Sequence, residues 1–219
     1  NDLDYLHLTS NNTIFGTQFR EFPDTKIPLV ADKSSDIFSR ELDFSRFDLI
    51  YAGAQKNMGP AGTTLVVVRE DVLGNESRKI PTMLDYQVHI AKKSMFNTPP
   101  VFAVYTSLLT LEWLKRQGGI GAMEERNEKK AKLLYSEIDL NPLFEGYARP
   151  EDRSAMNATF NLTEPGLKET FDKMWAEAGI SGLNGHRSVG GYRASMYNAL
   201  PLESVGVLVD VMSDLERRG

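Results

Sequence analysis

The chain has 219 residues and a formal net charge of −5, with 41% hydrophobic residues, 25% charged residues and no cysteine. This composition is typical of a globular protein, and the lack of cysteine excludes disulfides, thiolate nucleophiles and cysteine-held zinc or iron–sulfur centres within these residues. The acidic balance argues against a nucleic-acid or membrane surface as partner, and no apolar run approaches the ~20 residues of a spanning helix. We therefore expect a cytoplasmic enzyme or binding protein.

Four short apolar runs open the chain, at residues 5–8, 27–31, 47–53 and 63–68. Each run is continuous rather than alternating, which is typical of strands buried on both faces of an α/β sheet. Thr13, Asp32 and Lys56 lie just past the ends of three of these runs. Since open α/β sheets bind ligands at the carboxyl ends of their strands, these residues predict a binding site.

Residues 80–100 show no clear period and are expected to form a long, partly irregular loop. Pro99 and Pro100 then precede a run with helical spacing that Gly118 and Gly119 end, and a charged amphipathic helix is expected over 121–139.

The pattern changes near residue 156. An alternating, half-exposed strand is expected at 156–162, a helix at 167–179, a turn and strand at 186–198 and a final helix at 201–218. We expect an α/β fold with a mostly parallel sheet and helices in residues 1–115, followed by a small α+β domain in residues 116–219.

Lys56 lies in the small-residue stretch YAGAQKNMGPAG, directly after an apolar run. One reading is a structural lysine paired with a carboxylate, because such ion pairs are common. The other is chemical: an apolar setting disfavours the ammonium form of a lysine, and a free amine forms a Schiff base with an aldehyde. Pyridoxal phosphate uses a lysine in this way and needs an acidic partner for its ring nitrogen, a role for which Asp32 is suitably placed.

Several motifs carry a resemblance to a known family: SNNTIFG (10–16), VADKSS (30–35), AGAQKNMGPAG (52–62), MFNTPP (95–100) and GHRSVGGYRAS (185–195). In this order they resemble the phosphoserine aminotransferases, which are class V, fold-type I enzymes that use pyridoxal phosphate. The resemblance extends along essentially the whole chain. It implies that residues 1–115 are the C-terminal part of the large cofactor-binding domain of that fold.

The resemblance also implies roles for single residues. Lys56 looks like the Schiff-base lysine, Asp32 like the partner of the pyridinium nitrogen, and Thr13 like the residue that hydrogen-bonds the phenolic oxygen. Gln55 resembles a ligand of the cofactor phosphate. Asn97 and Thr98 resemble residues that reach the cofactor of a second subunit, which implies a homodimer with shared active sites, although they could also cap the following helix.

A basic turn near the end of the chain contains His186, Arg187 and Arg193 around Gly190 and Gly191. Arginine binds carboxylate and phosphate through paired hydrogen bonds, although single arginines are usually solvated surface residues. By resemblance, Arg193 holds the substrate α-carboxylate. His186 and Arg187 belong to the pocket for the substrate phosphate or for the distal carboxylate of glutamate.

The activity implied by the resemblance is transfer of the amino group from L-glutamate to 3-phosphohydroxypyruvate, giving O-phospho-L-serine and 2-oxoglutarate, without a metal. Members of the family also act on a phosphorylated four-carbon 2-oxo acid in pyridoxine biosynthesis. The family has a portion ahead of the first residue of this chain that holds the ring-stacking residue and a phosphate cup. We therefore expect the chain to be part of a longer polypeptide and to be inactive by itself.

Other functions remain open on the sequence. Within the same fold, a serine–glyoxylate type aminotransferase would not need the basic turn for a phosphate. A cysteine desulfurase would need a cysteine, and a cofactor-free Schiff-base lyase would use Lys56 directly on a substrate carbonyl. A non-catalytic scaffold would bind neither the cofactor nor a phosphorylated acid.

Overall fold

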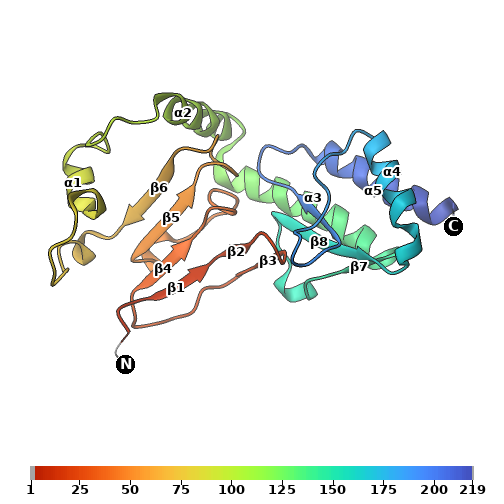
Figure 1. Cartoon of the computed structure of the whole chain (residues 1–219), viewed down its shortest axis with the longest axis horizontal. Helices are drawn as coiled ribbons and strands as arrows, with labels where there is room; N and C mark the ends of the chain where they lie inside the picture. The colour runs from red at the N-terminus through yellow and green to blue at the C-terminus, as the bar shows by residue number, and fades with distance from the viewer. Residues whose placement is uncertain (1–2, 219) are drawn as a thin grey trace.

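The computed structural model describes residues 3–218 and contains two separate main sheets, which Figure 1 shows at opposite ends of the molecule. The first is four-stranded in the order β1-β4-β5-β6. Its strands are β1 (Leu6–Thr9), β4 (Leu29–Asp32), β5 (Leu49–Gly53) and β6 (Thr64–Val68). The first three strands run parallel and β6 is antiparallel to β5, so the expected mostly parallel sheet is confirmed.

The register of this sheet aligns the carboxyl ends of its parallel strands. Thr9 pairs with Asp32, and Asp32 pairs with Tyr51 on the next strand. The segments that follow β1, β4 and β5 therefore leave the sheet at the same edge, which is where α/β sheets bind ligands.

The continuous apolar runs predicted that this sheet is buried on both faces, and this prediction is wrong. Leu29, Ala31 and Ile50 are buried, whereas His7 is exposed and Tyr51 is only half-buried on the opposite face. The reason is that the described loops cover one face only: the buried cluster consists of Phe22, Leu29, Ala31, Ile37, Phe47, Ile50, Ala52, Ala54 and Met58.

A small hairpin that the sequence did not predict connects the two sheets. It consists of β2 (Asn11–Asn12) and β3 (Thr17–Gln18), and Figure 1 shows it extending from the first sheet toward the second. The carbonyl of Phe15, in its turn, accepts a hydrogen bond from Thr159 Oγ1 at 2.8 Å. The hairpin thus places residues from the start of the chain against the second sheet.

The second sheet is three-stranded and antiparallel, in the order β7-β8-β9. Its strands are β7 (Phe144–Gly146), β8 (Asn157–Leu162) and β9 (Tyr192–Ser195), and the helices beside it are α3 (Gly119–Leu140), α4 (Lys168–Glu177) and α5 (Leu202–Arg218). Strand β7 was not predicted. The other elements confirm the predicted strands and helices of this part within a few residues at their ends.

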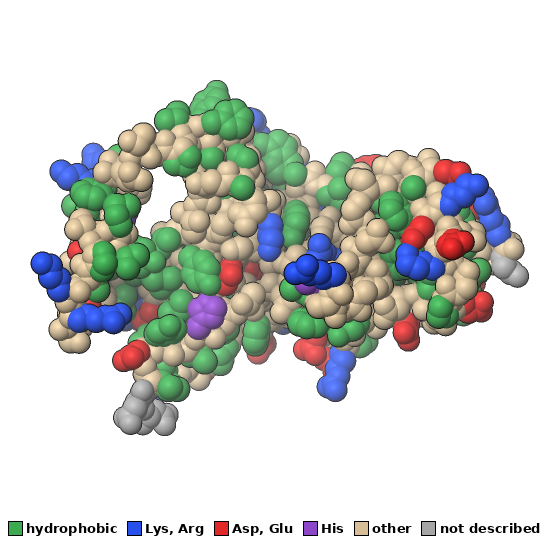
Figure 2. Space-filling view, in the orientation of Figure 1, with side chains coloured by type: hydrophobic (Ala, Val, Ile, Leu, Met, Phe, Trp, Pro, Cys, Tyr) green, Lys and Arg blue, Asp and Glu red, His purple; other side chains and the backbone are tan. Residues whose placement is uncertain are grey.

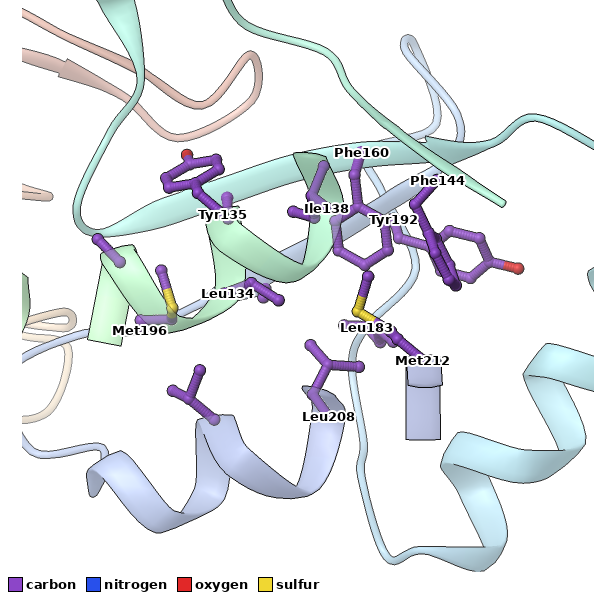
Figure 3. Packing of buried hydrophobic residues seen from close by; sticks show 14 of the residues in the cluster. Leu134, Tyr135, Ile138, Phe144, Phe160, Leu183, Tyr192, Met196, Leu208 and Met212 are labelled. Carbon is purple, nitrogen blue, oxygen red and sulfur yellow. The ribbon is translucent and has the colours of Figure 1, made fainter. Parts of the chain in front are cut away.

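The core of this part lies between α3, α5 and the second sheet. Figure 3 shows Leu134 and Ile138 of α3 and Leu208 of α5 gathered around Phe160 of the central strand. The prediction that 156–162 is half-exposed is wrong, because β8 is buried along its first four residues. Helices cover one of its faces, and contacts with the β2–β3 hairpin help to cover the other.

Two further helices follow β6. They are α1 (Tyr86–Ala91) and α2 (Val101–Arg116). Helix α1 corrects the expected irregular loop over 80–100: Asp85 caps it by accepting a hydrogen bond from the amide of Gln87 at 2.8 Å. The 3-10 turns are Phe44–Arg46, Glu70–Val72, Thr82–Leu84, Pro150–Asp152 and Pro165–Leu167.

Each main sheet has its own cluster of buried apolar side chains, which is consistent with a two-domain division. The proposed boundary between residues 115 and 116 stays a prediction, and it falls just inside the last turn of α2. Between residues 3 and 218, no helix has the length and apolar character needed to cross a membrane.

Candidate active site

Lys56 lies in a tight turn that follows β5. The carbonyl of Ala54 accepts hydrogen bonds from the amides of Met58 at 3.0 Å and Gly59 at 2.8 Å, which closes the turn around Lys56. Gly59 has a φ of 150°, and a Cβ there would lie 2.9 Å from Ser107 Oγ of α2. Only glycine therefore fits where the turn passes the helix, and the turn is fixed by its own backbone.

The Lys56 side chain is half-buried and points to the β2–β3 hairpin. Its Nζ donates a hydrogen bond to Thr13 Oγ1 at 2.8 Å, across 43 residues of sequence. Within residues 3–218, this contact ties the amine to a specific partner. The structure therefore joins two of the residues that the sequence placed past different strand ends.

The hairpin turn itself is built around Asn12. Its Oδ1 accepts hydrogen bonds from the amides of Ile14 at 3.0 Å and Phe15 at 3.1 Å. Gly16 closes the turn with a φ of 69°, and a Cβ there would lie 2.5 Å from Thr159 Oγ1. The turn is thus pressed against β8, and Thr13 is held between the two sheets.

Arg193 approaches the same turn from the second sheet. It lies on β9 opposite Thr159, and its Nη1 is 3.5 Å from the backbone carbonyl of Thr13. Its Nε is buried and has no hydrogen-bond partner within residues 3–218. A buried N–H without an acceptor is costly, so this half-buried side chain is suited to bind a carboxylate or phosphate through its Nε.

Asp32 ends β4 and lies on the half-exposed face of the first sheet. Its Oδ1 accepts a hydrogen bond from the amide of Ser34 at 2.8 Å, which starts the turn after the strand. Tyr51 lies beside it, and burial, together with the negative charge of Asp32, raises the pKa of the Tyr51 hydroxyl. That hydroxyl is also 3.0 Å from His7 Nε2.

Sequence reasoning missed Tyr51 and His7. A signal was available in the strand pattern, because residues that pair across neighbouring strands share a face. Asp32 pairs with Tyr51, and His7 pairs with Val30 two residues before Asp32. The polar side chains at these alternate positions mark the face of the sheet that carries the predicted carboxylate.

The backbone conformation of the basic turn depends on its two glycines. Gly190 and Gly191 have φ values of 77° and 61°, and a Cβ on Gly191 would lie 2.1 Å from Asn161 Oδ1. His186 Nδ1 accepts a hydrogen bond from the amide of Ser188 at 3.3 Å, which leaves Nε2 as the donor of the neutral ring. Arg187 is exposed.

The other predicted site residues are not joined to this centre. Gln55 is exposed at the turn before Lys56. Asn97 and Thr98 are exposed on the connection between α1 and α2, and the suggestion that they cap α2 is wrong, because its N-cap is Pro100, with no side-chain cap. The structure thus brings Thr13, Lys56 and Arg193 together and leaves Asn97, Thr98, His186 and Arg187 without a hydrogen bond to them.

Comparison with known proteins gives the family. The profile described as Aminotransferase class-V matches residues 1–208. The chain belongs to the class V aminotransferases. Phosphoserine aminotransferase of Flavobacterium johnsoniae is 70% identical over 217 residues, covering 99% of this chain and 61% of the relative.

Solved structures of class V aminotransferases agree with the fold. Phosphoserine aminotransferase from Bacillus circulans subsp. alkalophilus superposes with a TM-score of 0.94 at 48% identity, over 98% of this chain and 60% of that one. PLP-bound phosphoserine aminotransferase from Trichomonas vaginalis gives 0.90 at 38% identity, over 95% and 60%. These neighbours confirm the expected fold, and the chain spans about three fifths of the length of the relatives it matches.

Proposed function

We propose that this chain is the part of a phosphoserine aminotransferase that carries its reactive lysine and substrate-binding arginine. The reaction transfers the amino group of L-glutamate to 3-phosphohydroxypyruvate and yields O-phospho-L-serine and 2-oxoglutarate. One observation carries the proposal: Thr13 contacts both the Lys56 amine and the Arg193 guanidinium, which come from different sheets. The similar proteins are named phosphoserine aminotransferases, which supports the substrate assignment.

The residues present fit pyridoxal phosphate. Lys56 offers a half-buried amine, Asp32 a carboxylate at a strand end, and Arg193 a buried Nε that lacks a partner among the described residues. Pyridoxal phosphate supplies an aldehyde that condenses with amines and a ring that withdraws electrons from the substrate α-carbon. Lys56, Thr13, Asp32 and Gln55 would hold it.

The chain's own groups then have defined tasks. The Lys56 amine takes a proton from the substrate α-carbon and returns one, and the hydrogen bond to Thr13 orients it for this transfer. Arg193 binds the α-carboxylate through its free donors. The negative charge of Asp32 favours a protonated nitrogen beside it and so stabilises electron withdrawal from the α-carbon.

The basic turn accounts for the second anionic group of both substrates. The phosphate of phosphoserine carries close to two negative charges at neutral pH, and the distal carboxylate of glutamate carries one. Arg187 is exposed and His186 has its Nε2 available as a donor, so both can meet such a group. One basic pocket then serves both halves of the reaction.

A homodimer and a cytoplasmic location form part of the same proposal. Exposed apolar side chains gather on α1, α2 and the connection between them, as the upper part of Figure 2 shows. They include Tyr86, Ile90, Met95, Phe96, Val101, Phe102, Tyr105 and Leu108. A patch of this kind marks a protein interface, and a second subunit that covers it would bring its own site close to Asn97 and Thr98.

Two measurements on the full-length protein test the function. A visible absorbance band of bound aldehyde cofactor is expected, which neither a cofactor-free lyase nor a scaffold would have. Turnover with O-phospho-L-serine is then expected to exceed turnover with L-serine by a large factor. Equal turnover of the two amino acids would favour a serine–glyoxylate type enzyme, and a colourless protein would overturn the proposal.

A further inference from the structure

Three consecutive backbone carbonyls in the segment after Asp32 are each bound by a different asparagine. The carbonyls belong to residues 37–39. Asn57 Nδ2 donates to the first at 3.0 Å, Asn198 Nδ2 to the second at 2.9 Å, and Asn127 Nδ2 to the third at 2.9 Å. The three side chains come from the turn after β5, the segment after β9 and helix α3.

The asparagines are also bound to one another, and we call Asn57, Asn127 and Asn198 the asparagine cluster. The amide of Asn198 donates to Asn57 Oδ1 at 3.0 Å, and Asn127 Nδ2 donates to Asn198 Oδ1 at 2.9 Å. Their exposed fractions are 5%, 2% and 2% for residues 57, 127 and 198. Water therefore cannot replace a lost partner without a rearrangement.

Two members of the cluster lie close in sequence to residues of the candidate active site, and the carbonyls that the cluster binds follow Asp32. Asn57 directly follows Lys56, and Asn198 follows the strand that carries Arg193. Residues 37–39 end the segment that Asp32 begins, and the positive φ of 55° at Phe38 shows that its backbone is sharply turned there. The cluster is thus the point where the three segments of the site are fastened together.

Lys130 fixes the segment that precedes Asn198. It lies one helical turn after Asn127 on α3 and is fully buried. Its Nζ donates to the carbonyls of Met196 and Tyr197, at 2.9 Å each. The helix therefore holds this segment through two neighbouring side chains, the amide of Asn127 and the amine of Lys130.

We propose that the asparagine cluster positions the Lys56 amine relative to Asp32 and Arg193. The inference rests on the proposed function, because it concerns residues of the transaminase site. Truncation of Asn198 would leave the Phe38 carbonyl without this donor and remove one of the two acceptors of Asn127. The backbone amide of Asn198 still donates to Asn57 in the variant, but residues 37–39 lose a donor, and their shift would reach the Lys56 turn through the Asn57–Ile37 hydrogen bond. A displacement of about 1 Å at a reacting group can lower a rate by about a hundredfold.

The test compares Asn198→Ala with Asn141→Ala in the full-length protein. Asn141 is a matched control because it is 3% exposed and donates to Glu137 and Met212, yet it lies at the end of α3, away from the site. The first readout needs no cofactor: hydrogen–deuterium exchange of the Met58 and Gly59 amides, which the Ala54 carbonyl protects. The second readout is kcat and KM for glutamate, each determined by itself.

We expect Asn198→Ala to speed exchange at these two amides by about tenfold or more, and to lower kcat by about tenfold to a hundredfold with little change in KM. Asn141→Ala should change neither the exchange of these amides nor kcat, although both variants should lower the melting temperature. Parental exchange and kcat in Asn198→Ala would overturn the proposal, and so would equal changes in the two variants.

Two further measurements keep the outcome clear. If Asn198→Ala does not fold, Asn127→Ala breaks the same cluster while introducing a better helix former, and the same expectations apply in weaker form. If the parent protein does not transaminate phosphoserine, the proposed function fails. The exchange comparison still decides whether the cluster holds the Lys56 turn.

Discussion

The guanidinium of Arg193 meets the backbone of Thr13 across 180 residues of sequence, with 3.5 Å between Nη1 and the carbonyl oxygen. This distance is long for a hydrogen bond, so the contact orients the guanidinium without using its full capacity to donate. Thr13 also accepts the hydrogen bond of Lys56 through its hydroxyl. A single residue of the hairpin therefore lies between the amine and the cation that the proposed reaction needs, and contacts both.

Replacement of Lys56 by alanine is expected to abolish transamination and leave the fold intact. The side chain is half-buried and donates one hydrogen bond within residues 3–218, whose loss should lower the free energy of unfolding by only about 1 kcal/mol. Borohydride reduction of the parent protein, followed by peptide mapping, should place the cofactor label on Lys56. Lys92→Ala, at an exposed position, serves as the control. A label on Lys33 or on any other lysine would contradict the assignment.

Replacement of Asp32 by asparagine should slow the half-reaction with glutamate by about a hundredfold while cofactor affinity changes less. The reason is the loss of a negative charge that stabilises a protonated nitrogen. Rapid-mixing absorbance measures the rate, and Asp24→Asn at an exposed position is the control. A parental rate in Asp32→Asn would count against the role.

The same variant has a structural readout. Burial and the Asp32 charge together raise the pKa of Tyr51, so removal of the charge should lower that pKa part of the way. A tyrosinate titration, with Tyr51→Phe to identify the signal, measures the change. An unchanged pKa would mean that the carboxylate does not act on Tyr51.

The basic turn is expected to separate phosphorylated from unphosphorylated substrates. Arg187→Ala and His186→Ala should lower kcat/KM for O-phospho-L-serine by about tenfold to a hundredfold, because each removes a hydrogen bond to a charged group. Arg193→Ala should harm O-phospho-L-serine and L-serine alike, since both carry the α-carboxylate. If Arg187→Ala and His186→Ala lowered both activities equally, these residues would not read the phosphate.

Replacement of Gly16 by alanine should displace the turn that holds Thr13. The new Cβ would lie 2.5 Å from Thr159 Oγ1 and 2.7 Å from the Asn157 carbonyl, at a φ of 69°. A loss of about 1–3 kcal/mol in the free energy of unfolding is expected, with a fall in kcat. Gly206→Ala is the control, because nothing lies within 4 Å of its Cβ and helix α5 should gain stability. Urea unfolding compares the two, and equal effects would show that the turn tolerates a side chain.

Lys130 should make stability depend on alkaline pH. Burial, with a smaller contribution from Arg126, lowers its pKa from 10.5 to about 8. Between these values the unfolded chain binds more protons than the folded chain, so this residue makes the free energy of unfolding rise with pH, by about 3 kcal/mol in total. Lys130→Met should lose that rise.

Urea unfolding of the parent and of Lys130→Met is measured from about pH 7 upward, in steps of about one pH unit. Taking the difference between the two proteins removes the contributions of Tyr135 and Tyr192, whose pKa values burial raises. A parallel pH dependence in both proteins would show that Lys130 is not the group responsible.

The sequence predicted the long elements well because their patterns are local. The strands of the first sheet and helices α2 to α5 have continuous apolar runs or helical spacing over many residues. The β2–β3 hairpin and β7 were missed because strands of two or three residues carry no measurable period. The burial of β8 was misjudged because the hairpin that helps to cover it lies far away in the sequence.

The proximity of Thr13 and Lys56 was predictable because both follow strand ends. Arg193 lies within β9 and was singled out from the basic turn and by resemblance, and the roles of all three stay predictions. The asparagine cluster was not predictable, because asparagines are common in turns and helices alike. Their structural role arises only because they come from three other parts of the fold and bind three consecutive carbonyls of one segment. No pattern within a short window contains that information.

The placement of Thr13 at the tip of the hairpin has a consequence for how the protein is made on the ribosome. Thr13 and Lys56 leave the ribosome before Arg193, which follows 180 residues after Thr13. A nascent chain can therefore present the Lys56 amine before the Arg193 guanidinium has left the ribosome. The contacts of Thr13 with both groups would be complete only once the last strand of the second sheet had been added.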